Sequence, residues 1–326
     1  MEVGVNISVD HRMGARDLRI DVLKGIGIIL VVWGHCVGIF IREICIFHIP
    51  LFFFLSGLFF SSKPNFVWRK MKTLIFPAIG YSIFFFLSVS ILGGGYAERF
   101  KAFSIYNLAV FDGPLWFLYA LFLISVFYYF LFRLVKNSLW RLIFTYAIGI
   151  GFVLWDVTLP FYLRQAACSL PFYSTAYFLN QKGWVYTKNK GWIILFVSLF
   201  VAAILFYRIT HSRVDIARLW FPKNFVVFYV GALAAIMLML NLPIFQIRTR
   251  VNILLSSIGT ESLAIMALHY PFFPDIKLSI VEQHILSNES YNGLFSGITA
   301  FILLLSLSYL LSLGYREVKK LLRQNG

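Results

Sequence analysis

Ten long apolar stretches, separated by short polar segments, limit what this chain can fold into more than any other feature. A helix that crosses a bilayer needs roughly 20 mainly apolar residues, because hydrocarbon offers no partner to an unpaired backbone group. The expected spans are residues 22–41, 44–60, 74–92, 115–134, 142–157, 161–178, 192–207, 225–240, 253–273 and 294–313. We therefore expect an all-α fold, a polytopic membrane helix bundle of about ten transmembrane helices.

The composition excludes an ordinary water-soluble domain. Hydrophobic residues make up 60% of the 326 residues and charged residues only 13%, whereas soluble domains carry about 25% charged residues. The formal net charge of +15 does not indicate nucleic-acid binding, since the basic residues lie in short segments between apolar stretches. Membrane lipid is the expected surrounding, and no nucleic acid is expected as a partner.

The distribution of basic residues predicts an orientation. Residues 1–20 carry charges instead of an apolar signal sequence, so the N-terminus is expected to stay in the cytosol. If the N-terminus is inside and the spans alternate, the inner segments hold most of the 29 Lys and Arg residues. This distribution is the expected one, because basic residues resist translocation. One outer segment, after the seventh apolar stretch, opposes the rule with Arg208, Arg213, Arg218 and Lys223. A multi-pass protein of the cytoplasmic (inner) membrane with both termini cytoplasmic is expected.

No linker, low-complexity run or internal repeat divides the chain. We expect a cytoplasmic segment over residues 1–20, one transmembrane domain over residues 21–315 and a basic cytoplasmic tail over residues 316–326. The three cysteines all fall within apolar stretches without metal-ligand spacing. They are expected to be buried, inert thiols, and no metal site is expected.

The best candidate for chemistry is a pair of ionisable residues in the first apolar stretch, Lys24 and His35. Eleven residues turn a helix by about 1,100°, which is about 20° beyond three full turns, so both side chains face the same way about 16 Å apart. Such a pair suits a cation that holds phosphates at the cytosolic mouth and a deeper imidazole that takes a proton. The alternative, of about equal weight, is that Lys24 extends to the headgroups and His35 only bonds a neighbouring helix.

Further basic residues follow the second apolar stretch. Arg69 and Lys72 are three residues apart and would share a helix face near the mouth of the first helix, where they could bind phosphate. Lys70 lies between them. For any one of these residues, a role as a positive-inside anchor is the more frequent case.

The second stretch begins with His48 and Pro50 and continues to Ser56. A proline that bends the helix suits a cavity wall, although an interfacial histidine beside a structural kink explains the same residues. Gly34 and Gly38, on either side of His35, would permit another helix to approach closely.

Three polar positions later in the chain stay open between roles. His269 could line an acceptor pocket or mark the membrane interface. Arg164 could recognise an anionic acceptor or pair with Asp156 for structural reasons. Glu261 is a single carboxylate within the ninth apolar stretch, and such residues are functional candidates by default.

Five motifs in this order resemble the acyltransferase-3 family of membrane acyltransferases, in particular the sugar O-acetyltransferases similar to fucose 4-O-acetylases. The first joins a basic residue to a histidine across ten positions, and the fourth contains Trp116. The motifs are DVLKGIGIILVVWGH at 21–35, FHIPLFFFLSG at 47–57, KMKTLIFP at 70–77, PLWFL at 114–118 and GTESLAIMALHYP at 259–271.

The resemblance implies an acyl-CoA donor, such as acetyl-CoA, bound from the cytosol, with His35 as the catalytic residue. It implies donor binding by Lys24, Arg69 and Lys72, with Lys72 in place of the family's second arginine, so the bidentate fork is lost. Acceptor or cavity candidates within the motifs are His48, Ser56, Trp116 and His269. Arg164 is a further candidate from its position alone, outside the motifs. No permanently bound cofactor is expected. Some relatives carry an additional extracytoplasmic domain, so a separate extracytoplasmic partner is considered.

Two functions from different classes follow. The first is an O-acyltransferase, in particular an O-acetyltransferase, acting on a hydroxyl of a cell-envelope polysaccharide or a lipid-linked sugar with His35 as general base. The second is a transporter or flippase of a lipid-linked glycan that uses the same polar cavity without chemistry. Transporters often show paired broken helices in two halves, and the sequence lacks such a pattern.

Overall fold

The structure is a computed structural model, and it describes residues 17–92, 113–187, 189–222, 224–269 and 292–324. Most of the expected cytoplasmic segment 1–20 therefore lies outside the described residues. The same holds for the end of the ninth expected span, from residue 270, and for the last two residues of the tail.

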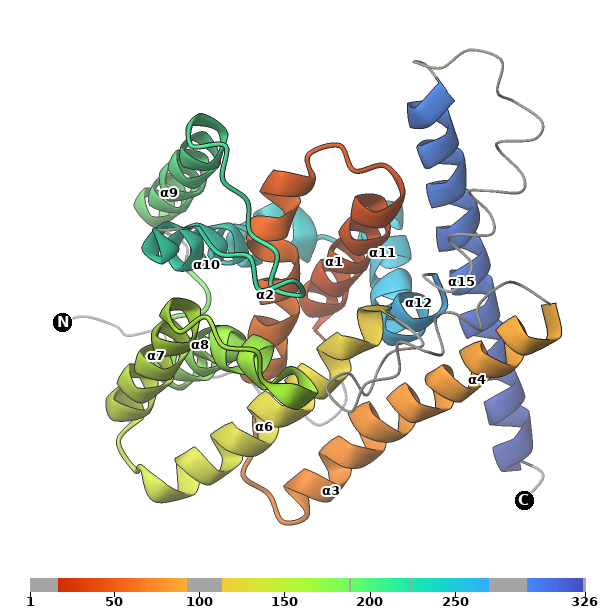
Figure 1. The fold of residues 1–326 in the computed structure, drawn as a ribbon, viewed down its shortest axis with the longest axis horizontal. Helices are drawn as coiled ribbons and strands as arrows, with labels where there is room; N and C mark the ends of the chain where they lie inside the picture. The colour runs from red at the N-terminus through yellow and green to blue at the C-terminus, as the bar shows by residue number, and fades with distance from the viewer. Residues whose placement is uncertain (1–16, 93–112, 188, 223, 270–291, 325–326) are drawn as a thin grey trace.

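The described residues form helices joined by loops, which confirms the all-α class (Figure 1). Each expected apolar stretch overlaps a helix or a pair of consecutive helices. The elements are α1 (Leu18–Cys36), α2 (Ile41–Leu58), α3 (Phe66–Lys70), the π-helix η1 (Met71–Ile75), α4 (Phe76–Leu92), η2 (Gly113–Leu115), α6 (Trp116–Leu134), α7 (Ser138–Leu154), η3 (Pro160–Tyr162), α8 (Leu163–Lys182), α9 (Lys190–Ile209), α10 (Phe225–Asn241), η4 (Pro243–Gln246), α11 (Arg250–Thr260), α12 (Ser262–His269) and α15 (Asn292–Gln324).

Side chains that favour a helix start precede several of these helices. The Asp17 carboxylate accepts a hydrogen bond from the backbone N–H of Arg19 at the start of α1. Asn137, Asn189 and Thr249 accept in the same way from the first turns of α7, α9 and α11. These contacts satisfy backbone donors that a helix leaves without partners at its N-terminus.

Four described helical segments are long and apolar enough to cross a membrane: Ile41–Leu58, Gly113–Leu134, Lys190–Ile209 and Gly297–Val318. The pair α11 and α12 makes a fifth if it counts as one bent span. The apolar helices α7 and α10 are shorter, with 17 residues each. These lengths and compositions are those of a multi-pass membrane protein.

Helix α9 is apolar on nearly every side and is scarcely buried by the rest of the protein. Only Ala203 and Tyr207 of its described side chains are buried, while Ile194 is 65% and Ile209 77% exposed. A helix with such a surface would be insoluble in water, so its exposed face fits lipid.

At the centre of the bundle, α1 packs against α11 with backbone in contact with backbone (Figure 1). A Cβ added at Gly25 would lie 2.0 Å from the carbonyl oxygen of Leu255, and one added at Gly259 would lie 1.8 Å from that of Asp21. Gly34 and Gly38, which the sequence suggested for such a contact, do not serve it: the nearest atom to a Cβ at Gly34 is in the Ile41 side chain, and Gly38 is open.

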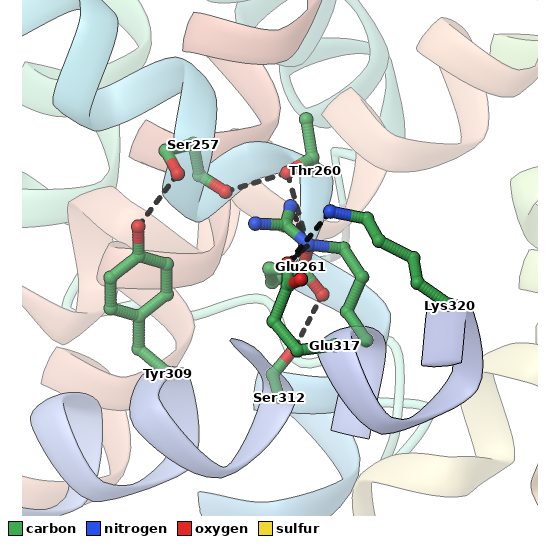
Figure 2. Close-up of polar contacts among 8 residues, drawn as sticks. Ser257, Thr260, Glu261, Tyr309, Ser312, Glu317 and Lys320 are labelled. Carbon is green, nitrogen blue, oxygen red and sulfur yellow. Dashed lines mark hydrogen bonds and ion pairs between the residues drawn. The ribbon is translucent and has the colours of Figure 1, made fainter. Parts of the chain in front are cut away.

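The ninth expected span is broken into two helices, α11 and α12, that are bent by 66° at Glu261. Figure 2 shows Glu261 at this break beside Ser312 of α15, with Tyr309 reaching Ser257 on α11. Ser312 donates a hydrogen bond to the Glu261 carboxylate, and Arg316 forms an ion pair with it at 2.8 Å. The carboxylate at the break is therefore paired with a cation on the last described helix, α15.

Candidate active site

A cavity of about 730 Å³ opens between α1, α2, α6 and α12. The segment before α4 and the loop between α9 and α10 complete its wall. Its size is within the range of small-molecule sites, about 300–1,000 Å³. The polar residues on its wall are Lys24, His35, Cys45, His48, Ser56, Lys70, Asp215, Arg218 and Ser262.

Lys24 and His35 both line this cavity, three turns apart along α1. Lys24 Nζ lies 3.5 Å from a carboxylate oxygen of Asp21, which is buried, and 5.8 Å from the centroid of the Phe59 ring. The His35 side chain is exposed to the cavity. Asp21 therefore partly neutralises Lys24, a pairing that the three-residue spacing of Asp21 and Lys24 could have indicated.

His48 adds a second imidazole to the cavity wall. Its Nδ1 lies 2.8 Å from the carbonyl oxygen of Ile44, one turn earlier in α2. A carbonyl oxygen can only accept, so Nδ1 carries the proton and donates, and the neutral ring keeps its lone pair on Nε2. Of the two roles that the sequence left open, cavity wall and interface, the structure supports the cavity wall.

His269 lies behind His35 and does not line the cavity. It is completely buried, and its ring centroid lies 5.4 Å from that of His35. Its Nδ1 donates a hydrogen bond to the carbonyl oxygen of Ile265 at 2.9 Å, which holds the ring in place. The His269 ring therefore lies next to His35 but outside the cavity lining.

Of the basic residues before α4, the one that lines the cavity is not one of the two that the sequence favoured. Lys70 lines the cavity, whereas Arg69 and Lys72 are exposed outside its lining, with Lys72 Nζ 5.2 Å from the Trp68 ring centroid. The chain changes from α-helix to the wider π-helix η1 directly after Lys70. That change alters which side chains share a face, and such π-turns are frequent at functional sites.

Of the other expected cavity residues, Ser56 and Trp116 line the wall. Cys45 lines it as well, although the sequence placed it among buried thiols. Arg164 does not reach the cavity. It is 4% exposed and donates to Asp156 at 2.6 Å and to the carbonyl oxygen of Phe152 at 3.0 Å. The structural role of Arg164 is therefore the one that the geometry supports.

Asp215 and Arg218 line the same cavity but were not singled out for the site from the sequence. Both belong to the loop between α9 and α10, far from α1 along the chain. The excess of basic residues in this expected outer segment was the one available signal.

This helix bundle, with cations and imidazoles around one cavity, belongs to the class of membrane acyltransferases, because a family model described as an acyltransferase domain matches residues 17–316. The chain belongs to the acyltransferase-3 family. No curated protein and no solved structure matches it.

Proposed function

We propose that the protein transfers an acyl group, in particular an acetyl group, from cytoplasmic acyl-CoA to a hydroxyl of a cell-envelope polysaccharide or lipid-linked sugar. The observation that carries this proposal is one cavity of about 730 Å³ that Lys24 and Lys70 line together with His35 and His48. The resemblance to sugar O-acetyltransferases supports the sugar as acceptor. Membership of the acyltransferase-3 family supports the reaction class.

The donor is proposed to bind at the end of the cavity that is lined by Lys24 and Lys70. Both ammonium groups can donate charge-assisted hydrogen bonds to the phosphates of coenzyme A. Arg69 and Lys72, on the adjacent surface, are proposed to attract the donor from the cytosol without entering the cavity. The pantetheine arm then follows the apolar wall of α1 and α2 toward His35.

At the other end, His35 is proposed as the general base. Its imidazole takes the proton of the acceptor hydroxyl while the hydroxyl oxygen attacks the thioester carbonyl carbon. The tetrahedral intermediate collapses, the C–S bond breaks, and the departing thiolate takes the proton back from the imidazolium. The products are the sugar ester and free coenzyme A, and His35 returns to its starting state.

This chemistry fits a protein of about ten spans in the inner membrane with both termini in the cytosol. In that orientation, the start of α1 and Lys24 lie at the cytosolic face, where acyl-CoA is available. A separate extracytoplasmic partner would not be needed for the transfer step itself.

The test is the replacement of His35 by alanine. General-base catalysis contributes about 10²–10⁴-fold, so His35→Ala should lower acyl transfer by about 100-fold or more while the protein still inserts in the membrane. The measurement is the mass of envelope glycans from cells that express either form, together with coenzyme A release by the purified protein.

His211→Asn is the matched control, because His211 is exposed outside the cavity and asparagine tolerates its positive φ. It should retain activity. A fully active His35→Ala enzyme would overturn the mechanism. Loss of the whole glycan polymer, without the loss of one acyl unit from an intact polymer, would favour the transporter or flippase.

A further inference from the structure

The loop between α9 and α10 enters the cavity beside His35. Asp215, Ile216, Ala217 and Arg218 line the cavity, and Ile216 is 3% exposed. Asp215, Arg218 and His35 all line this one cavity. The loop after α9 therefore forms part of the cavity wall, together with His35.

Several hydrogen bonds hold this loop in one conformation. The backbones of Asp215 and Trp220 exchange two hydrogen bonds of 2.9 Å, and the Asp215 carboxylate accepts from the backbone N–H of Arg218 at 3.1 Å. From α8, the side chain of Gln165 donates to the carbonyl oxygen of Ala217 at 3.2 Å. Leu219 has a φ of 59°, a conformation that persists only where the surroundings enforce it. The loop therefore presents Arg218 from a defined position.

The guanidinium of Arg218 has capacity for a ligand. Its side chain is 65% exposed, and its ion pair with Asp215 is long, 3.6 Å from Nε to a carboxylate oxygen. By comparison, the structural pair of Arg164 and Asp156 is 2.6 Å. A guanidinium has five N–H donors, arranged to hold a phosphate or carboxylate with two parallel hydrogen bonds.

The other basic residues of this segment have structural partners where the structure describes them. Arg208 pairs with Glu43 at 2.6 Å, and the Arg213 guanidinium lies 4.1 Å from the Trp220 ring centroid, outside the cavity lining. Among the described members of the group, Arg218 is the one that lines the cavity. Basic residues on the outer side of a membrane protein oppose insertion, so a functional reason for retaining Arg218 is expected.

We infer that this loop is an acceptor-binding element, and that Arg218 binds an anionic group, a phosphate or a carboxylate, on the sugar whose hydroxyl faces His35. Asp215 is placed to accept hydrogen bonds from hydroxyls of the same sugar. The inference rests on the proposed acyl transfer and narrows its acceptor to anionic saccharides. A neutral sugar would offer the Arg218 guanidinium no anionic group in addition to its long ion pair with Asp215.

Binding to the purified full-length protein, measured by calorimetry, tests the inference with three probes: glucose, glucose 1-phosphate and glucuronic acid. The protein should bind at least one anionic probe about tenfold or more tightly than glucose, the discrimination expected from one charge-assisted hydrogen bond. Preference for glucose 1-phosphate indicates a phosphate-bearing acceptor such as a lipid-linked sugar. Preference for glucuronic acid indicates an acidic sugar.

Arg218→Gln should abolish the preference, and Arg218→Lys should retain part of it. Arg213→Gln is the matched control, because Arg213 belongs to the same loop and contacts the same Trp220 ring from outside the cavity. It should bind as the unchanged protein does. Equal binding of all three probes, or a preference that survives in Arg218→Gln, would overturn the inference.

The release of coenzyme A from acetyl-CoA with water as acceptor, measured in parallel, tests the proposed function separately. If this release depends on His35 but no anionic sugar is preferred, acyl transfer stands and the acceptor assignment fails. If the preference depends on Arg218 but no coenzyme A is released, the binding site stands and the reaction assignment fails.

Discussion

Among single residues, Lys70 combines two properties that link donor binding to pH. It lines the cavity, and burial lowers the pKa of its ammonium group to about 8, with a smaller contribution from the neighbouring charge of Arg69. Below that pH the side chain is protonated and positive, and above it the neutral amine is favoured. The charge that a phosphate would bind is therefore lost just above physiological pH.

We expect the affinity for acyl-CoA to fall as pH rises from 7 to 9. A bound phosphate favours the charged amine, so the midpoint in the complex should lie above the value of the free protein. Lys70→Arg should remove most of the pH dependence, because arginine stays charged throughout this range. Binding of a non-hydrolysable acyl-CoA analogue at several pH values measures the effect.

Lys72→Arg is the control for that experiment, since Lys72 lies outside the cavity lining. The pH dependence should persist in this variant. An affinity that is flat from pH 7 to 9 in the unchanged protein would contradict the role of Lys70.

The residues of the site were predictable to the extent that they share one helix. Lys24 and His35 could be placed together because the period of a regular helix links them. Arg69 and Lys72 were preferred to Lys70 because a regular helix was assumed, and the π-helix η1 breaks that assumption. Asp215 and Arg218 reach the cavity through a loop fold that no local pattern reveals.

Among the elements, the contact between α1 and α11 decides where Lys24 and His35 lie. Gly25 and Gly259 allow the two backbones to touch, and a methyl group at either position would overlap a carbonyl oxygen of the other helix. The helices would have to separate, and α1 carries Lys24 and His35 on the cavity wall. This contact therefore couples stability to the geometry of the site.

Gly259→Ala should destabilise the protein by about 1–3 kcal/mol or more, the usual cost of overpacking a core. The melting temperature in detergent should fall, and activity should fall with it. Gly80→Ala is the control: a Cβ at Gly80 meets nothing within 4 Å. In that helix, alanine should be neutral or stabilising by about 0.5–1 kcal/mol. Equal melting temperatures for both variants would contradict the close contact.

The positions of the helices were predictable from apolar length alone, because each expected stretch overlaps a helix or a helix pair. The break between α11 and α12 was not. Glu261 was visible in the sequence, but its partners Ser312 and Arg316 lie more than 50 residues further along the chain. Contacts between residues so far apart along the chain decide whether a carboxylate lies within a straight span or at a bend, and no local pattern shows them.

At the scale of the whole molecule, the inferred acceptor loop and the proposed donor end should face opposite sides of the membrane. Helix α9, which is long and apolar enough to cross, separates Lys182 from Arg213. Both residues are exposed, so a cysteine placed at either position would be accessible to a reagent on its own side.

We expect Arg213→Cys to react with a membrane-impermeant maleimide in intact cells, and Lys182→Cys to react only after the membrane is opened. Both variants are made with Cys45 replaced by serine, because Cys45 lines the cavity. Reaction of both cysteines from the same side would contradict the proposed orientation and would remove the separation of donor and acceptor.

The ion pair between Glu261 and Arg316 has a practical consequence for shortened versions of the chain. The Glu261 side chain is 13% exposed, so a truncation that ends before Arg316 leaves its carboxylate with no opposing cation in a largely desolvated position. The last turns of α15 are thus part of the folded enzyme, and a fusion tag belongs after them.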